Sequence, residues 1–120
     1  MIQRQEIIKG IEGAPVVRQA VVRDSTVYLA GITADPAGDV MTQTRQVLQR
    51  IDTLLAQAGT DKSRLLTAQV WLADIRMFGG HNAAWNEWVD QDNPPVRACV
   101  ESRLFWPGLL VEIMATAAMP

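Results

Sequence analysis

Hydrophobic and polar residues recur along the chain with two different periods, which separate predicted helices from predicted strands. The clearest helical pattern begins after Asp39, a residue type that caps helix N-termini. It ends at Gly59, because glycine tolerates the left-handed backbone that follows a helix. We expect the intervening polar side chains, including Gln43, on the face opposite the apolar positions. Those apolar positions are Val40, Val47, Leu48, Ile51, Leu54, Leu55 and Ala58.

A second, shorter helix is predicted from about Arg76 or Gly80 to Val89, ahead of a pair of prolines that cannot continue it. Four of its residues recur at steps of four, three and four and therefore share one face. They are Phe78, Asn82, Trp85 and Val89. His81, next to Asn82, is expected to face solvent.

Six segments rich in β-branched and apolar residues predict strands. Turn-forming residues separate the second from the third and the fifth from the sixth, and a tight hairpin between the last two would place Arg103 opposite Glu112. The order β-β-β-α-β-α-β-β predicts an α+β fold with both helices on one sheet face. The other face is also apolar, which indicates a partner subunit. The segments are Gln3–Ile8, Val16–Val22, Thr26–Ile32, Leu65–Leu72, Val96–Leu104 and Leu109–Ala117.

Composition narrows the classes of function. The chain has 120 residues, 48% of them hydrophobic, which suits one soluble domain. A net charge of −2 without a block of basic residues argues against nucleic acid as a partner. One cysteine, Cys99, and one histidine, His81, exclude an internal disulfide and a Cys/His zinc site within one chain.

The same features bear on location. The first residues contain no apolar core of a signal peptide, so secretion is not expected. The longest apolar stretch, 109–118, is too short to span a bilayer and contains Glu112. With a single cysteine, these features predict a cytoplasmic protein without membrane association.

Arg97 and Glu112 are the strongest candidates for chemistry. Arg97 follows Pro94-Pro95-Val96 at the start of a strand, where it is either a surface residue or a clamp for a carboxylate through two parallel hydrogen bonds. Glu112 lies among apolar residues, so it must pair, take up a proton or face a cleft. Such a setting raises a carboxyl pKa toward that of a general acid or base, and the alternative is an ion pair with Arg97 or Arg103.

Two further residues carry weaker signals. Asn82 lies on the apolar stripe of the second helix, where a buried amide is typical of a structural hydrogen bond. Cys99 shares its strand face with Arg97, and we interpret it as a small buried hydrophobic residue rather than a reactive thiol.

Several short motifs follow one another in a specific order along nearly the whole chain. Pro95-Val96-Arg97-Ala98-Cys99-Val100 is followed by Val111-Glu112-Ile113, with the glutamate fifteen residues after the arginine. The ordered set resembles the YjgF/RidA family, and the Trp-rich segment 84–89 is closest in appearance to its YoaB-type branch. The other motifs are Tyr28-Leu29-Ala30-Gly31, Gln43-Thr44 with Val47-Leu48, Ala58-Gly59, and Phe78 with Asn82 and Trp85.

The resemblance implies a chorismate-mutase-like α+β fold, one domain over residues 1–120, and a homotrimer with clefts between subunits. Active members hydrolyse enamine and imine intermediates, such as 2-aminoacrylate and 2-iminopropanoate, to 2-oxo acids and ammonia without a bound cofactor. If the roles known in the family apply to the matching positions of this chain, Arg97 would hold the substrate carboxylate and Glu112 would position or activate water. Asn82 would support the pocket, which Cys99, Gly31 and Ala30 would line.

Two positions depart from the deaminase pattern. Ala30 stands where deaminase members carry serine, and Val16 stands where they carry tyrosine. Because these hydroxyls are missing, a second function is also compatible with the sequence: the protein would be a trimer that binds small carboxylates or 2-oxo acids without catalysing a reaction. Endoribonuclease activity, attached by name to some relatives, is a third, but a pI near 5.3 and the lack of a basic stripe argue against it.

Overall fold

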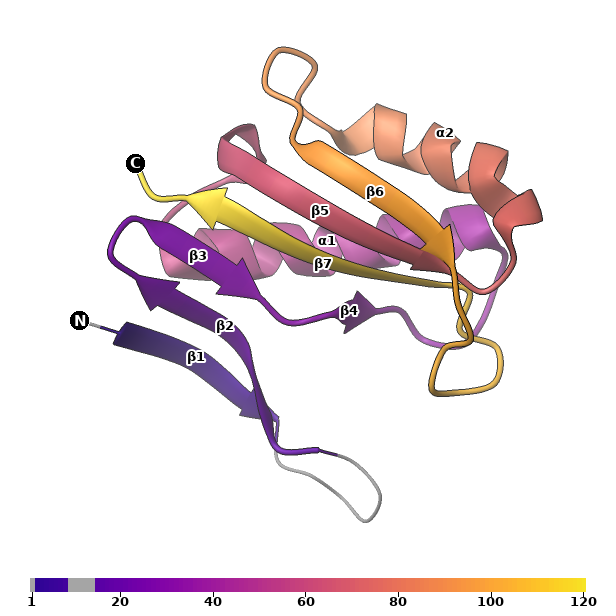
Figure 1. The fold of residues 1–120 in the computed structure, drawn as a ribbon, viewed down its shortest axis with the longest axis horizontal. Coiled ribbons are helices and arrows are strands. Elements are labelled where there is room, and N and C mark those ends of the chain that lie inside the picture. The colour runs from indigo at the N-terminus through magenta and orange to yellow at the C-terminus, as the bar shows by residue number, and fades with distance from the viewer. Residues whose placement is uncertain (1, 9–14) are drawn as a thin grey trace.

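One mixed sheet and two α-helices form the two layers of the molecule (Figure 1). The computed structural model describes residues 2–8 and 15–120. The sheet has the strand order β1-β2-β3-β7-β5-β6, and the short β4 also pairs with β7. The predicted order of strands and helices is therefore confirmed, with one added short strand. The strands are β1 (Ile2–Ile8), β2 (Val17–Arg23), β3 (Thr26–Leu29), β4 (Ile32–Thr33), β5 (Leu65–Leu72), β6 (Val96–Glu101) and β7 (Val111–Ala118).

The helix α1 (Val40–Ala58) has the predicted ends. The Asp39 side chain accepts a hydrogen bond from the amide of Thr42 at 2.8 Å, and Gly59 adopts the left-handed conformation with φ 92°. The second helix, α2 (Phe78–Trp88), follows the 3₁₀ turn η2 (Ile75–Met77), and another 3₁₀ turn, η1 (Lys62–Arg64), precedes β5. Within residues 2–8 and 15–120, no helix has both the length and the apolar character needed to cross a membrane.

The core lies between the sheet and the helices, and it is built from alternate strand residues. Val70 and Leu72 of β5 and Val111 and Ile113 of β7 are fully buried on this helix face of the sheet. The residues between them point to the opposite face, which no helix of the described residues covers; we call it the open face. Several large apolar side chains remain exposed there: Tyr28, Val96, Val100 and Met114.

The predicted hairpin around residues 106–108 is wrong. β5 lies between β6 and β7, pairing parallel with β6 and antiparallel with β7. The reason is the β5-α2-β6 connection, because a crossover through a helix returns the chain parallel to the strand that it left. The partners of Glu112 are consequently Trp71 and Thr33 rather than Arg103.

Gln43 also departs from the prediction, since it is buried although its position follows the polar pattern of α1. Its amide nitrogen donates to the carbonyl of Gly108 at 2.8 Å, and its amide oxygen accepts from the backbone N–H of Leu110 at 2.9 Å. The side chain thus satisfies the backbone of the segment that connects β6 to β7. A polar pattern alone cannot show that the backbone of a distant loop needs such a partner.

Candidate functional site

Arg97 extends from β6 toward α2 and lies in a cage of neutral groups. Its Nη2 donates to Oδ1 of Asn82 at 2.8 Å, and its Nη1 lies 3.2 Å from Nε2 of His81. The guanidinium carbon lies 5.0 Å from the ring centre of Trp85 and 5.9 Å from that of Phe78. Three of the four residues predicted to share a face of the second helix therefore surround this arginine.

The guanidinium of Arg97 is partly buried and has no acidic partner among the described residues, where each ion pair involves another arginine. A guanidinium has five N–H donors, and the two contacts with Asn82 and His81 leave about three of them free. Removing a charge from water without an anion beside it is costly. The geometry therefore suits an anionic ligand that supplies the missing charge, and a carboxylate fits the fork of N–H groups.

His81 is fully buried, so the prediction that it faces solvent is wrong. Its Nδ1 lies 2.9 Å from the hydroxyl oxygen of Thr44 on α1, and its Nε2 faces Arg97. Burial, together with the positive charge of Arg97, lowers the pKa of His81 from 6.5 to about 4. The sequence contained an indication that His81 is buried. Residues three and four positions after Phe78, which are 81 and 82, can both lie on the inner face of the helix.

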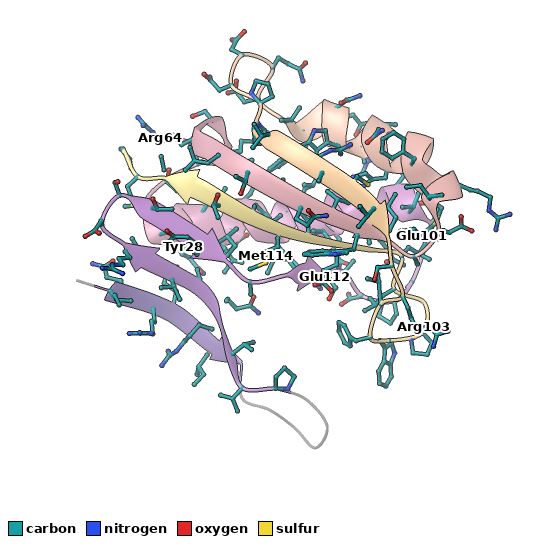
Figure 2. The ribbon with its side chains drawn as sticks, viewed as in Figure 1. Tyr28, Arg64, Glu101, Arg103, Glu112 and Met114 are labelled. Atoms are coloured by element: carbon teal, nitrogen blue, oxygen red, sulfur yellow. The ribbon has the colours of Figure 1, made fainter. Side chains whose placement is uncertain are left out.

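Glu112 projects from β7 onto the open face, the face of the sheet that also carries Met114 and Tyr28 (Figure 2). Among the described residues, its side chain makes neither the predicted ion pair with Arg97 or Arg103 nor any hydrogen bond. Partial burial raises the pKa of this carboxyl above its usual value of 4.5. A carboxyl with a raised pKa and free oxygens suits proton transfer near neutral pH.

The carboxylate of Glu112 packs against Gly31, in the break between β3 and β4. A Cβ added at Gly31 would overlap Oε2 of Glu112 and lie 3.1 Å from its Cδ. Ala30, the preceding residue, is partly buried and donates its amide to the carbonyl of Gln19 at 2.8 Å. The missing side chain of Gly31 thus provides the space in which Glu112 lies.

Replacing Gly31 with alanine is expected to displace the Glu112 carboxylate while the fold is kept, because the atoms in the way end a flexible side chain. In a deaminase that uses Glu112 for proton transfer, as the family resemblance implies, a shift of about 1 Å in that group costs roughly 100-fold in rate, so turnover should fall by that order. The measurement is the initial rate of 2-oxo acid formation, with circular dichroism as a check on folding.

The matched control for Gly31→Ala is Gly79→Ala, because a Cβ at Gly79 of α2 would meet no atom within 4 Å. This variant should keep the wild-type rate. Equal rates for Gly31→Ala and wild type would mean that the position of Glu112 does not matter for turnover.

Arg97 and Glu112 lie on opposite faces of the sheet of one protomer. Arg97 is level with Ala68 and points to the helix face, whereas Glu112 is level with Trp71 and points to the open face. They are separated by two strand spacings, about 9.6 Å, and by three residues along the strands, about 10 Å. A ligand of three or four carbon atoms cannot contact both side chains within one chain.

Cys99 lies two residues beyond Arg97 on the same side of β6 and is partly buried. Burial raises the pKa of its thiol, with a smaller opposing effect from Arg97, so the thiolate is disfavoured. This agrees with its interpretation as a small hydrophobic residue. Within the described part of the chain, no three His, Cys, Asp or Glu side chains are grouped to hold a metal ion.

Known proteins resemble this chain over most of its length. The family described as Endoribonuclease L-PSP matches residues 13–119. A RutC family protein of Haemophilus ducreyi is 43% identical over 84% of this chain and 87% of its own. The RutC family protein YoaB of Escherichia coli is 36% identical over 82% of this chain and 87% of its own.

Two further likenesses concern function and fold. A goat protein named 2-iminobutanoate/2-iminopropanoate deaminase is 35% identical over 82% of this chain and 77% of its own. The crystal structure of NMB1025, a YjgF family member from Neisseria meningitidis, superposes with a TM-score of 0.90 at 32% identity, covering 100% of this chain and 96% of that one. The chorismate-mutase-like fold with two helices on a mixed sheet is thereby confirmed. The chain belongs to the Endoribonuclease L-PSP family, the YjgF/RidA proteins, with RutC family proteins such as YoaB among its relatives.

Proposed function

We propose that this protein hydrolyses small 2-imino acids and their enamine tautomers to 2-oxo acids and ammonia. The family membership supports this class of reaction, since one relative is named for deamination of 2-iminobutanoate and 2-iminopropanoate. The observation that carries the proposal is the Arg97 guanidinium, which is partly buried, held by neutral groups and without an acidic partner among the described residues.

Arg97 binds the substrate carboxylate through its free N–H donors. Asn82 fixes one end of the guanidinium, and the rings of Trp85 and Phe78 restrict its plane. Because the carboxylate does not react, this contact holds the adjacent imine carbon in a fixed place and contributes through orientation. An arginine suits this role better than a lysine, whose ammonium lacks the planar fork.

Glu112 acts on the water and the leaving nitrogen. The imine enters with its nitrogen protonated, and the Glu112 carboxylate takes a proton from a water molecule while the water oxygen attacks C2, which gives a neutral carbinolamine. The carboxyl proton then passes to the nitrogen and the C–N bond breaks to release ammonia. The Glu112 carboxylate takes the hydroxyl proton as the 2-oxo group forms and returns it to the solvent or to the departing ammonia. The products are one ammonia and one 2-oxo acid per imine and water. The raised pKa of Glu112 suits these proton transfers.

The proposed site combines two protomers, which is supported by the orientation of Arg97 and Glu112 toward opposite faces of one sheet. We place the cleft between Arg97 of one protomer and Glu112 with Gly31 of the next. The exposed apolar side chains of the open face support burial against a second copy. A homotrimer, as the family resemblance implies, repeats this contact three times around a closed ring.

The test is 2-oxo acid formation from imines generated in place by an amino-acid oxidase or a serine/threonine dehydratase. The wild-type protein should accelerate hydrolysis, and Arg97→Ala should lower kcat/KM on the order of 100-fold or more, because it removes a bidentate charged contact. The matched control is Arg45→Ala, which removes an arginine from α1 that pairs with Glu87 on the outer side of the helices.

Failure of the wild-type protein to accelerate any imine in the panel would contradict the deaminase proposal. In that case the absence of hydroxyls at Ala30 and Val16 favours a trimer that binds small carboxylates without chemistry. Thermal stabilisation by pyruvate, lost in Arg97→Ala, would then identify that function.

A further inference from the structure

A buried chain of polar contacts runs from α1 through α2 to Arg97. Thr44 and His81 are both fully buried, and the hydroxyl of Thr44 lies 2.9 Å from Nδ1 of His81. On the other side of the ring, Nε2 lies 3.2 Å from Nη1 of Arg97. The ring of His81 thus links the helix layer to the guanidinium that the proposed reaction uses.

The chemistry of the guanidinium fixes the protonation of this ring. All five N–H groups of an arginine are donors and none of its atoms accepts, so Nε2 of His81 must carry a lone pair. The ring proton therefore lies on Nδ1, which donates to the hydroxyl oxygen of Thr44. A second proton would remove the acceptor and place two positive charges in contact, which agrees with a pKa of His81 lowered to about 4.

The lack of charge on His81 matters for ligand binding as much as its position beside Arg97. A carboxylate at position 81 would also accept from Arg97, but it would cancel the charge and compete with a substrate carboxylate. His81 and Asn82 hold two nitrogens of the guanidinium through neutral acceptors and leave its full charge for a ligand. Without His81, one end of the long side chain loses its anchor and can rotate about its torsions.

We propose that His81 is a positioning residue for Arg97: as the neutral tautomer with its proton on Nδ1, it anchors the guanidinium without neutralising it. Thr44 holds His81 in that tautomer. The part of this inference that concerns a substrate carboxylate rests on the proposed function, whereas the tautomer and the anchoring of Arg97 do not.

The first measurement is the protonation state of His81 in the wild-type protein, from nitrogen-15 NMR of its imidazole at pH 7. We expect a protonated Nδ1 and an unprotonated Nε2. Since His81 is the only histidine in the sequence, the signals need no assignment by mutation. A proton on Nε2, or a doubly protonated ring, would overturn the proposal, because neither form accepts from Arg97.

The second measurement compares two substitutions. His81→Phe keeps a flat ring but removes the acceptor, whereas His81→Gln places a neutral carbonyl oxygen close to the original Nε2. We expect the dissociation constant for pyruvate to rise about tenfold or more in His81→Phe and to stay within about threefold of wild type in His81→Gln. The maximal deaminase rate should change less than the affinity in both, since the carboxylate contact is present in ground and transition states alike.

Arg45→Ala serves as the control, because it also removes a side-chain contact between α1 and α2 but leaves Arg97 untouched. Wild-type affinity in His81→Phe would overturn the proposal, as would an equal loss in His81→Gln and His81→Phe. If His81→Phe does not fold, the tautomer of His81 in the wild-type protein and the pyruvate affinity of His81→Gln still test the positioning role of His81. If the wild-type protein binds pyruvate but hydrolyses no imine, the deaminase proposal is contradicted. The role of His81 is then still tested by its tautomer and by the pyruvate affinities of the two variants.

Discussion

Two inactive variants, Arg97→Ala and Glu112→Gln, are expected to regain about one third of wild-type activity when they assemble into the same trimer. The reason is that, in the proposed homotrimer, each cleft takes Arg97 from one protomer and Glu112 from its neighbour, an arrangement that their positions on opposite sheet faces support. In any trimer that contains both variants, one of three clefts combines an intact arginine with an intact glutamate.

The experiment is co-expression of the two variants with different affinity tags, followed by purification over both tags so that only hybrids remain. The rate of 2-oxo acid formation is then compared with the rates of the two parent variants. As a control, the double variant Arg97→Ala/Glu112→Gln, hybridised with either parent, should stay inactive, because no cleft then has both groups. Inactive hybrids of the single variants, with their mass confirmed by light scattering, would place both residues in one protomer or outside the mechanism.

Mild acid is expected to destabilise the wild-type protein more than His81→Gln. In the unfolded chain His81 takes up a proton near pH 6.5, whereas in the folded protein it stays neutral down to about pH 4. Between these values the unfolded state binds more protons, so the free energy of unfolding falls as the pH falls, by about 1.4 kcal/mol per pH unit and about 3 kcal/mol in total. Above pH 6.5 the contribution is constant.

Urea unfolding of both proteins at equal concentration, at several pH values from 7.5 to 4, measures this difference. The other titrating groups are common to the two proteins, and so is the positive charge of Arg97, which together with burial lowers the pKa of His81. The difference in unfolding free energy should therefore change by about 3 kcal/mol across the window. A difference that is independent of pH would show that His81 titrates normally in the folded protein.

The local features of the fold were predictable because they depend on neighbouring residues. The caps Asp39 and Gly59 fix the ends of α1 through their own backbone and side-chain preferences, and both were predicted correctly. β5 was predicted with its observed ends, since its apolar and β-branched residues mark it as a buried strand. The third predicted strand was too long, because the chain breaks between β3 and β4 at Ala30 and Gly31.

The candidate site was predictable in part. Arg97 and Glu112 stood out because each is a charged residue in an apolar setting, and Asn82 because it interrupts an apolar stripe. The residue that lies opposite Glu112 on the neighbouring strand was not predictable, since it depended on whether β6 pairs with β7 or with β5. That choice is made by the path of α2 over the sheet, which the local pattern does not contain.

The sequence by itself determined the kind of molecule: the order of strands and helices, an α+β fold, and three polar residues placed where apolar ones belong. Only the tertiary structure decided what those residues face. It places Arg97 on the helix face and Glu112 on the open face, and it buries His81 between Thr44 and Arg97. The physical reason is that periodicity records which side of an element is buried, whereas the partner on that side comes from segments distant in the chain.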